Sequence, residues 1–219
     1  MNDLMIAIPQ NIENLQLPSP ELLAYYNDLQ RRVIWIDDFI DESLLFTVKR
    51  ILNWNCEDVD IPVEQRKPIH ILIFSPGGEL DFAFSLIDTI RMSKTPIVTV
   101  NMGNAMSAGL YILLAGHKRF ALPSSIALLH SGAATLGGTA SQTLASAQSY
   151  KNQLDRIKGY VLERTAIKTR TLNSRKDDDW YFTAEEQFQH GIVDEVISNI
   201  DQLINKTGRF DAADAAKPE

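Results

Sequence analysis

The hydrophobic positions of this chain follow two patterns that alternate along the sequence. Nearly continuous short apolar runs are typical of strands that are buried on both faces of a sheet. Apolar residues that recur every three or four positions indicate helices with one buried face. The predicted strands are 33–36, 69–74, 97–102, 120–122, 126–129 and 193–196. The predicted helices are 21–29, 41–54, 80–92, 107–116, 143–164 and 184–189.

The order of these segments predicts an α/β fold. Strands and helices alternate through most of the chain, and this alternation favours parallel pairing of the strands in one sheet. Between the second helix and the second strand, residues 55–68 are polar and contain Pro62 and Pro68, so we expect an exposed loop.

The two ends of the chain differ in composition from its middle. Residues 1–20 contain three prolines and have no clear period, so we expect an irregular N-terminal arm. Residues 206–219 have little apolar surface to bury, and we expect a disordered tail. The remaining residues, 21–205, then form one domain, and a chain of 219 residues is long enough for one domain with a sizeable core.

The composition narrows the range of partners and compartments. A net charge of −7 argues against non-specific binding to nucleic acid, which requires clustered Lys and Arg. Cys56 is the sole cysteine, so an internal disulfide and a cysteine-based zinc site are excluded, and the reducing cytoplasm is the expected location. The N-terminus lacks the pattern of a secretory signal, and no stretch is long and apolar enough to span a bilayer, so we expect no membrane partner.

Small residues surround a serine at the start of the fourth predicted helix. Ser107 lies within residues 103–109, which lead into the apolar stretch 110–116. A glycine turn, Ser75-Pro76-Gly77-Gly78 (residues 75–78), follows the second predicted strand. A hydroxyl at a helix start, together with a nearby glycine-rich turn, favours acyl transfer with a serine nucleophile and an oxyanion hole made of backbone N–H groups. Small residues keep that backbone accessible.

A serine nucleophile needs a base within hydrogen-bonding distance, and two of the four histidines are too far away. His117 lies ten residues further along the helix that starts at Ser107, which separates them by about 15 Å at ~1.5 Å per residue. His70 lies five residues before Ser75 on a strand, which is about 16 Å at ~3.3 Å per residue.

His130 and His190 remain as candidates for the base. His130 ends the strand 126–129, and catalytic groups of an open parallel sheet tend to lie at such strand ends. His190 would fit the chain order Ser–Asp–His of α/β-hydrolases, but their nucleophile turn has Gly two residues before the serine, where this chain has Ala105. We therefore favour His130 as the base.

An acidic run precedes an aromatic segment and supplies the expected third member. Asp177, Asp178 and Asp179 are followed by the aromatic residues 180–182. An acid that enters an apolar segment can be partly buried and can orient an imidazole. Asp179 is nearest to the aromatic residues, and we predict the triad Ser107, His130 and Asp179.

With these residues in this order, the chain resembles the Clp protease proteolytic subunits, which are caseinolytic serine peptidases. The resemblance covers about residues 22–200. It is carried by residues 25–34, the ungapped interval 75–107, Leu129-His130, and residues 179–194. The family's Ser-His-Asp order matches Ser107, His130 and Asp179.

The resemblance implies further site residues and a fold. The oxyanion amides fall on Gly78 and Ala108, and substrate-binding residues fall on Gly77 and on a strand edge at Leu136, Gly137 and Gly138. The implied architecture is a fold of repeated strand-strand-helix units shared with crotonases, with the long helix after Gly138 as a protruding handle. No metal and no organic cofactor are implied.

The resemblance also implies an assembly and partners. The subunits would form a homo-oligomeric ring of seven, and two rings would stack into a tetradecamer through the handle. Unfolded polypeptides would be cleaved inside the chamber after an AAA+ unfoldase has threaded them in.

The chain departs from the family pattern in several places. The family usually has an Arg before the catalytic Asp that pairs across the ring interface, and here that residue is Asp178. Arg175 and Lys176 are close enough in sequence to supply the positive charge. Leu72 and Met92 occupy usually aromatic positions of the unfoldase-docking groove. The 55–68 loop is longer than usual, and the N-terminal arm differs from the usual axial loop.

Two other functions are compatible with these patterns. One is a crotonase-type acyl-CoA hydratase or isomerase, which shares the two-amide oxyanion hole but usually uses a carboxylate base where this chain has Ser and His. The other is a non-catalytic ring subunit that supports an active paralogue, against which the intact set of Ser107, His130 and Asp179 argues.

Overall fold

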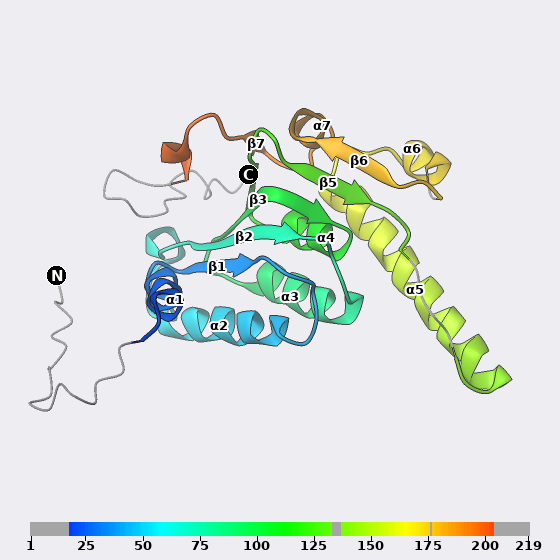
Figure 1. Ribbon diagram of the computed structural model, residues 1–219, viewed down its shortest axis with the longest axis horizontal. Coiled ribbons are helices and arrows are strands. Elements are labelled where there is room, and N and C mark those ends of the chain that lie inside the picture. Colours follow the sequence, from blue (N-terminus) through cyan, green and yellow to red (C-terminus); the bar gives the residue numbers. More distant parts are fainter. Residues whose placement is uncertain (1–17, 133–136, 176, 204–219) are drawn as a thin grey trace, which may run out of the picture.

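A mostly parallel β-sheet lies at the centre of the chain (Figure 1). The computed structural model describes residues 18–132, 137–175 and 177–203. Within these ranges the sheet has seven strands, of which five follow the order β1-β2-β3-β4-β7 and two, β5 and β6, branch from β3. The strands are β1 (Val33–Ile36), β2 (Ile69–Ser75), β3 (Ile97–Met106), β4 (Lys118–Ala121), β5 (Ile126–Leu129), β6 (Trp180–Thr183) and β7 (Glu195–Val196).

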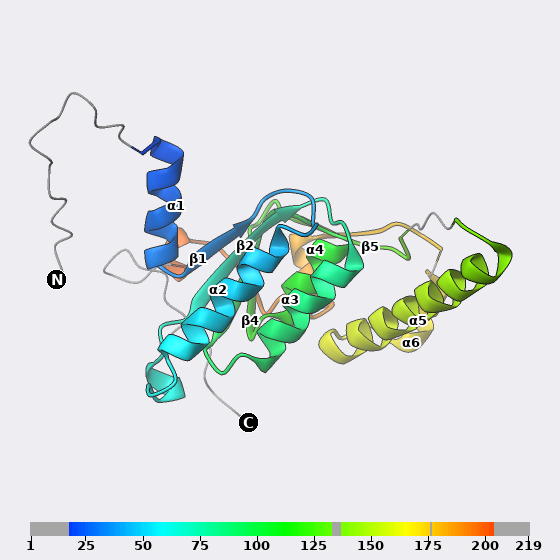
Figure 2. The same ribbon diagram turned by 90° about the horizontal axis from the view of Figure 1, so that it is seen from below.

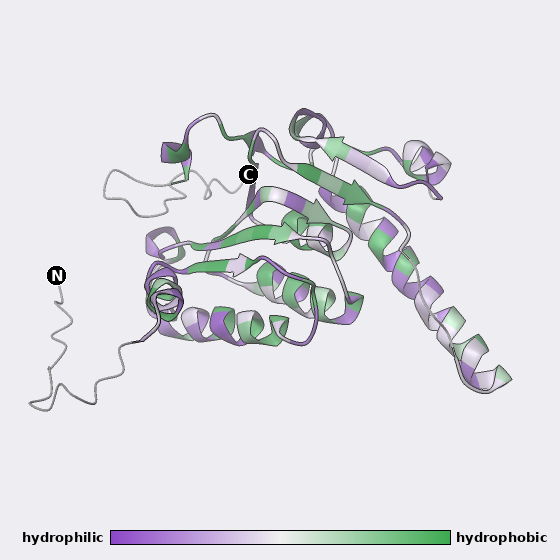
Figure 3. Cartoon of the chain, viewed as in Figure 1, coloured by the Kyte–Doolittle hydropathy of each residue, from purple (hydrophilic) through white to green (hydrophobic). Residues whose placement is uncertain are grey.

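Helices cover the sheet and extend from it. They are α1 (Pro20–Gln30), α2 (Leu44–Glu57), α3 (Leu80–Met92), α4 (Ala108–Ala115), α5 (Ala140–Arg164), α6 (Thr169–Ser174) and α7 (Ala184–Gln189), with 3₁₀ turns η2 (Val63–Gln65) and η3 (Ile200–Gln202). Helices α2, α3 and α4 lie together on one face of the sheet in both views (Figures 1 and 2). Every residue of α4 is buried, which explains why its sequence is apolar all round. Figure 3 shows the apolar residues concentrated on the central strands and on the helices that face them.

Helix α5 projects away from the sheet as a long arm (Figure 2). It is 25 residues long and starts at a capping box in which Thr139 and Gln142 satisfy each other's backbone N–H groups. Its buried residues, Ile157, Tyr160 and Val161, all belong to its C-terminal part. The N-terminal part of α5 therefore has little apolar contact with the rest of the described chain. No helix in the described ranges is long and apolar enough to cross a membrane.

Strand β3 changes partner midway, and this change brings β5 next to the end of β3, which Ser107 follows. Val98 to Asn101 pair with β4, whereas Asn104 to Met106 pair with β5. Asn101, which is fully buried, lies at the branch, where its side-chain amide donates to the carbonyl of Ile126 and to Oε1 of Gln187, each at 3.0 Å. These bonds connect β5 and α7 to β3, and they fix the direction in which β5 branches from β3.

The α/β class and most predicted elements are confirmed. The predicted bounds of α3, α7 and β5 agree with the structure, while β3 runs four residues further, to Met106, so that α4 begins at Ala108 rather than at Ser107. Helix α5 begins at Ala140, three residues before the predicted start. Residues 55–68 hold the last turn of α2 and η2 as well as exposed loop.

Two elements, β6 and α6, were not predicted, whereas the predicted strands pair in the parallel direction as expected. Strand β6 and helix α6 are short and have no clear period, and β6 pairs with β5 in the antiparallel direction. Most of the expected arm (1–20) and the whole expected tail (206–219) lie outside the described residues, and α1 begins at Pro20.

Buried His70 on β2 makes the fold sensitive to acid. The residue is 1% exposed, and burial, with a smaller effect from the charge of Lys67, lowers the pKa of His70 from 6.5 to about 3. Below about pH 6.5 the unfolded chain therefore binds a proton at His70, whereas the folded chain binds this proton only near pH 3. The free energy of unfolding is therefore not reduced by this group above that pH. It falls by about 1.4 kcal/mol per pH unit as the pH drops from there toward 3.

The non-titrating variant His70→Gln should lose this part of the acid sensitivity. We expect urea titrations at about pH 7.5 and about pH 5, at one protein concentration, to show a smaller drop in the free energy of unfolding for the variant than for the wild type. Equal drops would show that His70 is protonated in the folded chain.

Candidate active site

Ser107 occupies a strained turn between β3 and α4. Its φ of 53° and ψ of −119° are unusual for a residue with a side chain. Such strain persists where the surroundings fix the backbone, and it is common at functional sites. Here the Ser107 N–H donates to the carbonyl of Leu128 on β5 at 2.9 Å. The turn thus resembles a nucleophile elbow, in which a strand–turn–helix geometry exposes the hydroxyl.

His130 and Asp179 are brought together by the antiparallel pairing of β5 with β6. Leu129 pairs with Trp180, so the next position of this register sets His130 opposite Asp179. Nδ1 of His130 lies 3.4 Å from Oδ1 of Asp179. The carboxylate is on the exposed side of the pair, since the Asp179 side chain is 62% exposed and that of His130 28%. The missed strand β6 is therefore the element that aligns the predicted acid with the predicted base.

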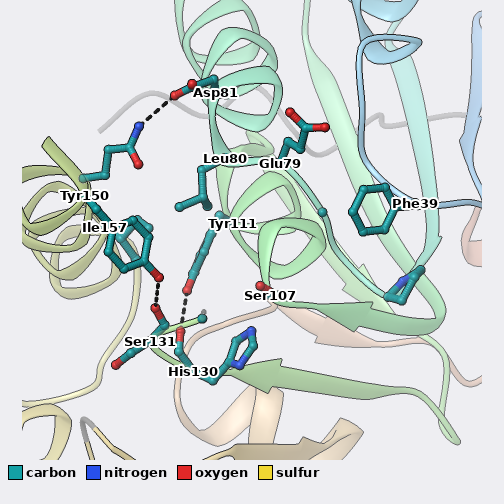
Figure 4. A pocket seen from close by; sticks show the side chains of 14 residues that line it. Phe39, Glu79, Leu80, Asp81, Ser107, Tyr111, His130, Ser131, Tyr150 and Ile157 are labelled. Carbon is teal, nitrogen blue, oxygen red and sulfur yellow. Dashed lines mark hydrogen bonds between the residues drawn. The ribbon is translucent and has the colours of Figure 1, made fainter. Parts of the chain in front are cut away.

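The other imidazole nitrogen faces the serine. Nε2 of His130 is buried and has no hydrogen-bond partner among the described residues. Figure 4 shows the imidazole next to Ser107 in the same cleft. A buried ring nitrogen without a partner is costly to maintain. At this position it can accept a proton from the hydroxyl or from a bound group.

The glycine turn packs against the start of α4. Gly77 and Gly78 have φ values of 100° and 154°. A Cβ on Gly77 would lie 2.8 Å from Cβ of Ser107 and 3.3 Å from N of Ala108, and a Cβ on Gly78 would lie 2.2 Å from the carbonyl oxygen of Ile40. Both positions therefore require glycine. The turn lies beside the first residue of α4, where helix N–H groups have no intrahelical partner and the helix dipole is positive.

Ser75 fixes the glycine turn through two hydrogen bonds of its hydroxyl, a role that the sequence did not indicate. Its hydroxyl donates to the carbonyl of Asp38 at 2.7 Å and accepts from the N–H of Gly77 at 3.1 Å. On the other side, the N–H of Ile40 donates to the carbonyl of Gly77 at 2.9 Å. These bonds hold the Gly78 region in place while no acceptor in the described chain takes the Gly78 amide.

Two tyrosines, also missed in the sequence, hold the segment that carries His130. The Tyr111 hydroxyl, from α4, donates to the His130 carbonyl at 3.1 Å, and the Tyr150 hydroxyl, from α5, donates to the Ser131 carbonyl at 2.9 Å (Figure 4). Burial raises the pKa of Tyr111 far above its usual value, so its hydroxyl stays a donor. The position of the His130 segment therefore depends on both α4 and α5.

Some of these residues line one cleft of about 710 Å³ (Figure 4), whereas Asp179 and Gly77 lie outside its lining. Ser107, His130 and Gly78 all contribute to its wall. The other lining residues are Phe39, Pro76, Glu79, Leu80, Asp81, Tyr111, Ser131, Gly132, Tyr150, Gln153 and Ile157. The cleft thus combines a hydroxyl, an imidazole and a backbone amide at one end with mixed polar and apolar walls.

The other histidines lie elsewhere. His117 accepts the N–H of Ile97 through Nδ1. His190 ends α7, and its ring packs edge-on against Trp180 and Phe182, with centroids 5.3 and 5.4 Å away. Neither residue lines the cleft, so the geometry favours His130 over His190.

The expected substrate-binding edge is not observed as a strand. Gly137 and Gly138 are in no strand, and Gly138, with a φ of 118°, bends the chain just before the cap of α5. A positive φ is incompatible with regular strand geometry, which is why the expectation of a strand at Gly138 was wrong. Leu136 and Lys176 lie outside the described residues.

Comparison with known proteins agrees with this fold. The family profile described as Clp protease matches residues 25–200. The ATP-dependent Clp protease proteolytic subunit 2 of Tropheryma whipplei is 32% identical over 171 residues, which cover 77% of this chain and 92% of that protein. Subunit 2 of Rhodococcus jostii is 29% identical over 182 residues, covering 82% and 90%. Subunit 1 of Streptomyces avermitilis is 30% identical over 178 residues, covering 80% and 79%.

A mixed α/β fold with a serine and a histidine in one cleft is compatible with a hydrolase, and the match over residues 25–200 identifies the family. The chain belongs to the Clp protease family. It is a peptidase, and the serine type follows from the family.

Proposed function

We propose that the chain is a serine endopeptidase subunit in which Ser107 is the nucleophile, His130 the general base and Asp179 the residue that orients the imidazole. One observation carries the proposal: Nδ1 of His130 is 3.4 Å from Asp179, while its Nε2 is buried and unpaired next to Ser107. A base held through one nitrogen and free at the other is what proton transfer from a hydroxyl requires.

The chemistry then follows from the positions of these groups. His130 takes the proton of the Ser107 hydroxyl through Nε2 as the oxygen attacks the peptide carbonyl. Asp179 accepts a hydrogen bond from Nδ1–H and stabilises the charged imidazole. The same proton goes to the leaving amine, which departs and leaves an acyl-enzyme for water to hydrolyse.

The oxyanion would be bound by the N–H groups of Gly78 and Ala108. The tight contact of Gly77 with the start of α4 supports this assignment, since it sets the two amides on neighbouring segments. Preorganised donors of this kind act most strongly on charge that develops in the transition state. We propose Gly77 as a substrate contact, and Gly137 and Gly138 as an edge that substrate meets without a regular strand.

We further propose that the subunits assemble into rings of seven, that the rings stack, and that an ATP-driven unfoldase supplies unfolded polypeptides. The names of the relatives, ATP-dependent Clp protease proteolytic subunits, support a partner ATPase. The free, exposed thiol of Cys56 suits the reducing cytoplasm.

A direct comparison of substrates tests the proposed function. The purified chain should hydrolyse unfolded casein and fluorogenic peptides, and it should leave crotonyl-CoA unchanged. Turnover of the CoA thioester without peptide cleavage would favour the crotonase-type function. Activity only when a paralogous subunit is added, and unaffected by loss of Ser107, would favour a non-catalytic ring subunit.

Stacking of rings should depend on salt because of the acidic run before β6. Asp178 and Asp179 are both exposed. Nη1 of Arg175 lies 4.0 Å from Oδ2 of Asp178. The guanidinium of Arg175 also lies over the Trp180 ring, 4.8 Å from the ring centroid. Arg175 therefore supplies positive charge close to where relatives carry an Arg. Grouped like charges repel more strongly as an interface excludes water.

Sedimentation velocity over a range of salt and pH should show single rings exchanging with double rings. Arg175→Ala should shift the mixture toward single rings, whereas Arg31→Ala, at the far end of α1, should leave it unchanged. Double rings that are insensitive to salt and to Arg175→Ala would show that the acidic run has no bearing on stacking.

A further inference from the structure

We propose that a second pocket, between α5, α6, β5 and β6, binds an aliphatic carboxylate such as a medium-chain fatty acid. Its volume of about 490 Å³ lies within the range of about 300–1,000 Å³ that is usual for small-molecule sites. The pocket adjoins the cleft, since His130 and Ser131 line both, but Ser107 and Gly78 line only the cleft. The inference goes beyond the proposed function, because it does not depend on the chemistry of Ser107.

The inner wall of this pocket is apolar. Leu129, Val161 and Trp180 line it and are buried. Leu154 and Leu172 line it from α5 and α6, and both pack against the hydrophobic core. A hydrocarbon chain that enters the pocket is therefore removed from water on several sides, which favours binding.

Basic residues outnumber acidic residues in the lining of this pocket. Apart from His130, the charged residues among the described lining residues are Lys151, Asp155, Lys158, Arg175 and Asp177. Nζ of Lys151 lies 3.0 Å from Oδ2 of Asp155, so these two charges offset each other. This set of residues has one positive charge in excess, although the whole chain has a net charge of −7.

Arg175 and Lys158 are suited to hold the carboxylate. The guanidinium of Arg175 lies over the ring of Trp180, so it stands beside the apolar wall. The ion pair of Arg175 with Asp178 is long, at 4.0 Å, and both side chains are about half exposed, so this pair is weak. Lys158 has no hydrogen-bond or ion-pair partner within the described ranges. A bound carboxylate gives both cations a partner, and it can accept two parallel hydrogen bonds from an Arg.

The uncharged polar groups of the lining favour an aliphatic ligand over a peptide. In the described part of the lining they are the side chains of Tyr111, Ser131 and Asn173. The Tyr111 hydroxyl already donates to the His130 carbonyl at 3.1 Å. A peptide would bring several amide groups that lose their hydrogen bonds to water and find few partners here, which is costly. A fatty acid has only one polar end.

Isothermal titration calorimetry of the purified full-length protein tests the class of ligand. Hexanoate, octanoate and decanoate should bind with affinities that rise by about 2- to 4-fold per added CH₂, because each CH₂ buries apolar surface. Decanol keeps the chain and lacks the charge, and it should bind about 10-fold more weakly than decanoate. Added salt should reduce this difference.

Variants of the two cations test the location of the site. Lys158→Gln and Arg175→Gln should each weaken decanoate binding by about 3- to 10-fold and leave decanol binding unchanged. Arg170→Gln is the matched control, because Arg170 lies on α6 outside the pocket lining and the substitution removes the same charge. Sedimentation velocity monitors the ring state, and Lys158→Gln decides the test if Arg175→Gln changes that state.

Glu79→Lys distinguishes this pocket from the adjoining cleft. Glu79 lines the cleft but not the pocket, so a new positive charge there should leave the affinity for decanoate unchanged. A gain in affinity would place the carboxylate in the cleft and overturn the separate site.

Three other results would overturn the proposal. They are decanoate that binds no more tightly than decanol, decanoate binding that Lys158→Gln leaves unchanged, and tighter binding of N-acetyl-Leu-Leu, a peptide with a free carboxylate, than of decanoate. The last result would replace the aliphatic ligand by a peptide. Failure of this proposal leaves the proposed peptidase function intact, because cleavage that depends on Ser107 is measured separately.

Discussion

Ser107→Ala should abolish peptide cleavage. The substitution removes the nucleophilic oxygen and keeps Cβ in the strained turn, so the backbone and the bond from Ser107 N–H to Leu128 should remain. In a serine peptidase with the same kind of triad, loss of the serine lowers kcat by about 10⁶-fold. We expect a loss of this order in an assay of peptide hydrolysis, with unchanged thermal unfolding.

A serine outside the cleft provides the control. Ser124, in the exposed loop before β5, can be replaced by alanine, and Ser124→Ala should keep wild-type activity. Cleavage that persists in purified Ser107→Ala protein would refute the proposed nucleophile.

His130→Ala and Asp179→Asn should each reduce turnover by orders of magnitude. The first removes the group whose Nε2 faces Ser107, and the second removes the charge that holds Nδ1–H. An amide in place of the acid favours the wrong imidazole tautomer, which costs about 10⁴-fold in the best-studied triad. Steady-state kinetics should show the loss mainly in kcat.

His190 distinguishes the two possible chain orders of the triad. Its ring packs against Trp180 and Phe182 and does not line the cleft, so His190→Ala should stay near wild-type activity. An inactive His190→Ala, together with an active His130→Ala, would replace the order Ser–His–Asp by Ser–Asp–His.

Sequence patterns predicted the core strands and the turn that carries Ser107 because both depend on local residue types. Strand β2 is a continuous apolar run, and its burial in the sheet follows from that run. Ser107 stands out because small residues surround it at a helix start. These signals need no knowledge of distant partners.

Elements that depend on distant partners were not predictable. Strand β6 is short, and its antiparallel pairing with β5 is set by tertiary contacts rather than by its own period. The hydrogen bond between Asn101 and Gln187 joins residues 86 positions apart, and the one between Gln153 and Asp81 joins residues 72 positions apart. A single sequence carries no signal for such pairs.

The supports of the site were missed for the same reason. Tyr111 and Tyr150 use only their hydroxyl groups, at 3.1 and 2.9 Å from carbonyls on the His130 segment. On a helix, an aromatic residue predicts core packing, and the partner of its hydroxyl becomes visible only in three dimensions.

The most direct test of the proposed triad is to map the covalent adduct of a fluorophosphonate by tandem mass spectrometry. The proposed triad predicts one adduct on Ser107, slower labelling in His130→Ala, and protection by a peptide substrate. An adduct on another residue, or peptide cleavage that continues without any adduct at Ser107, would contradict it.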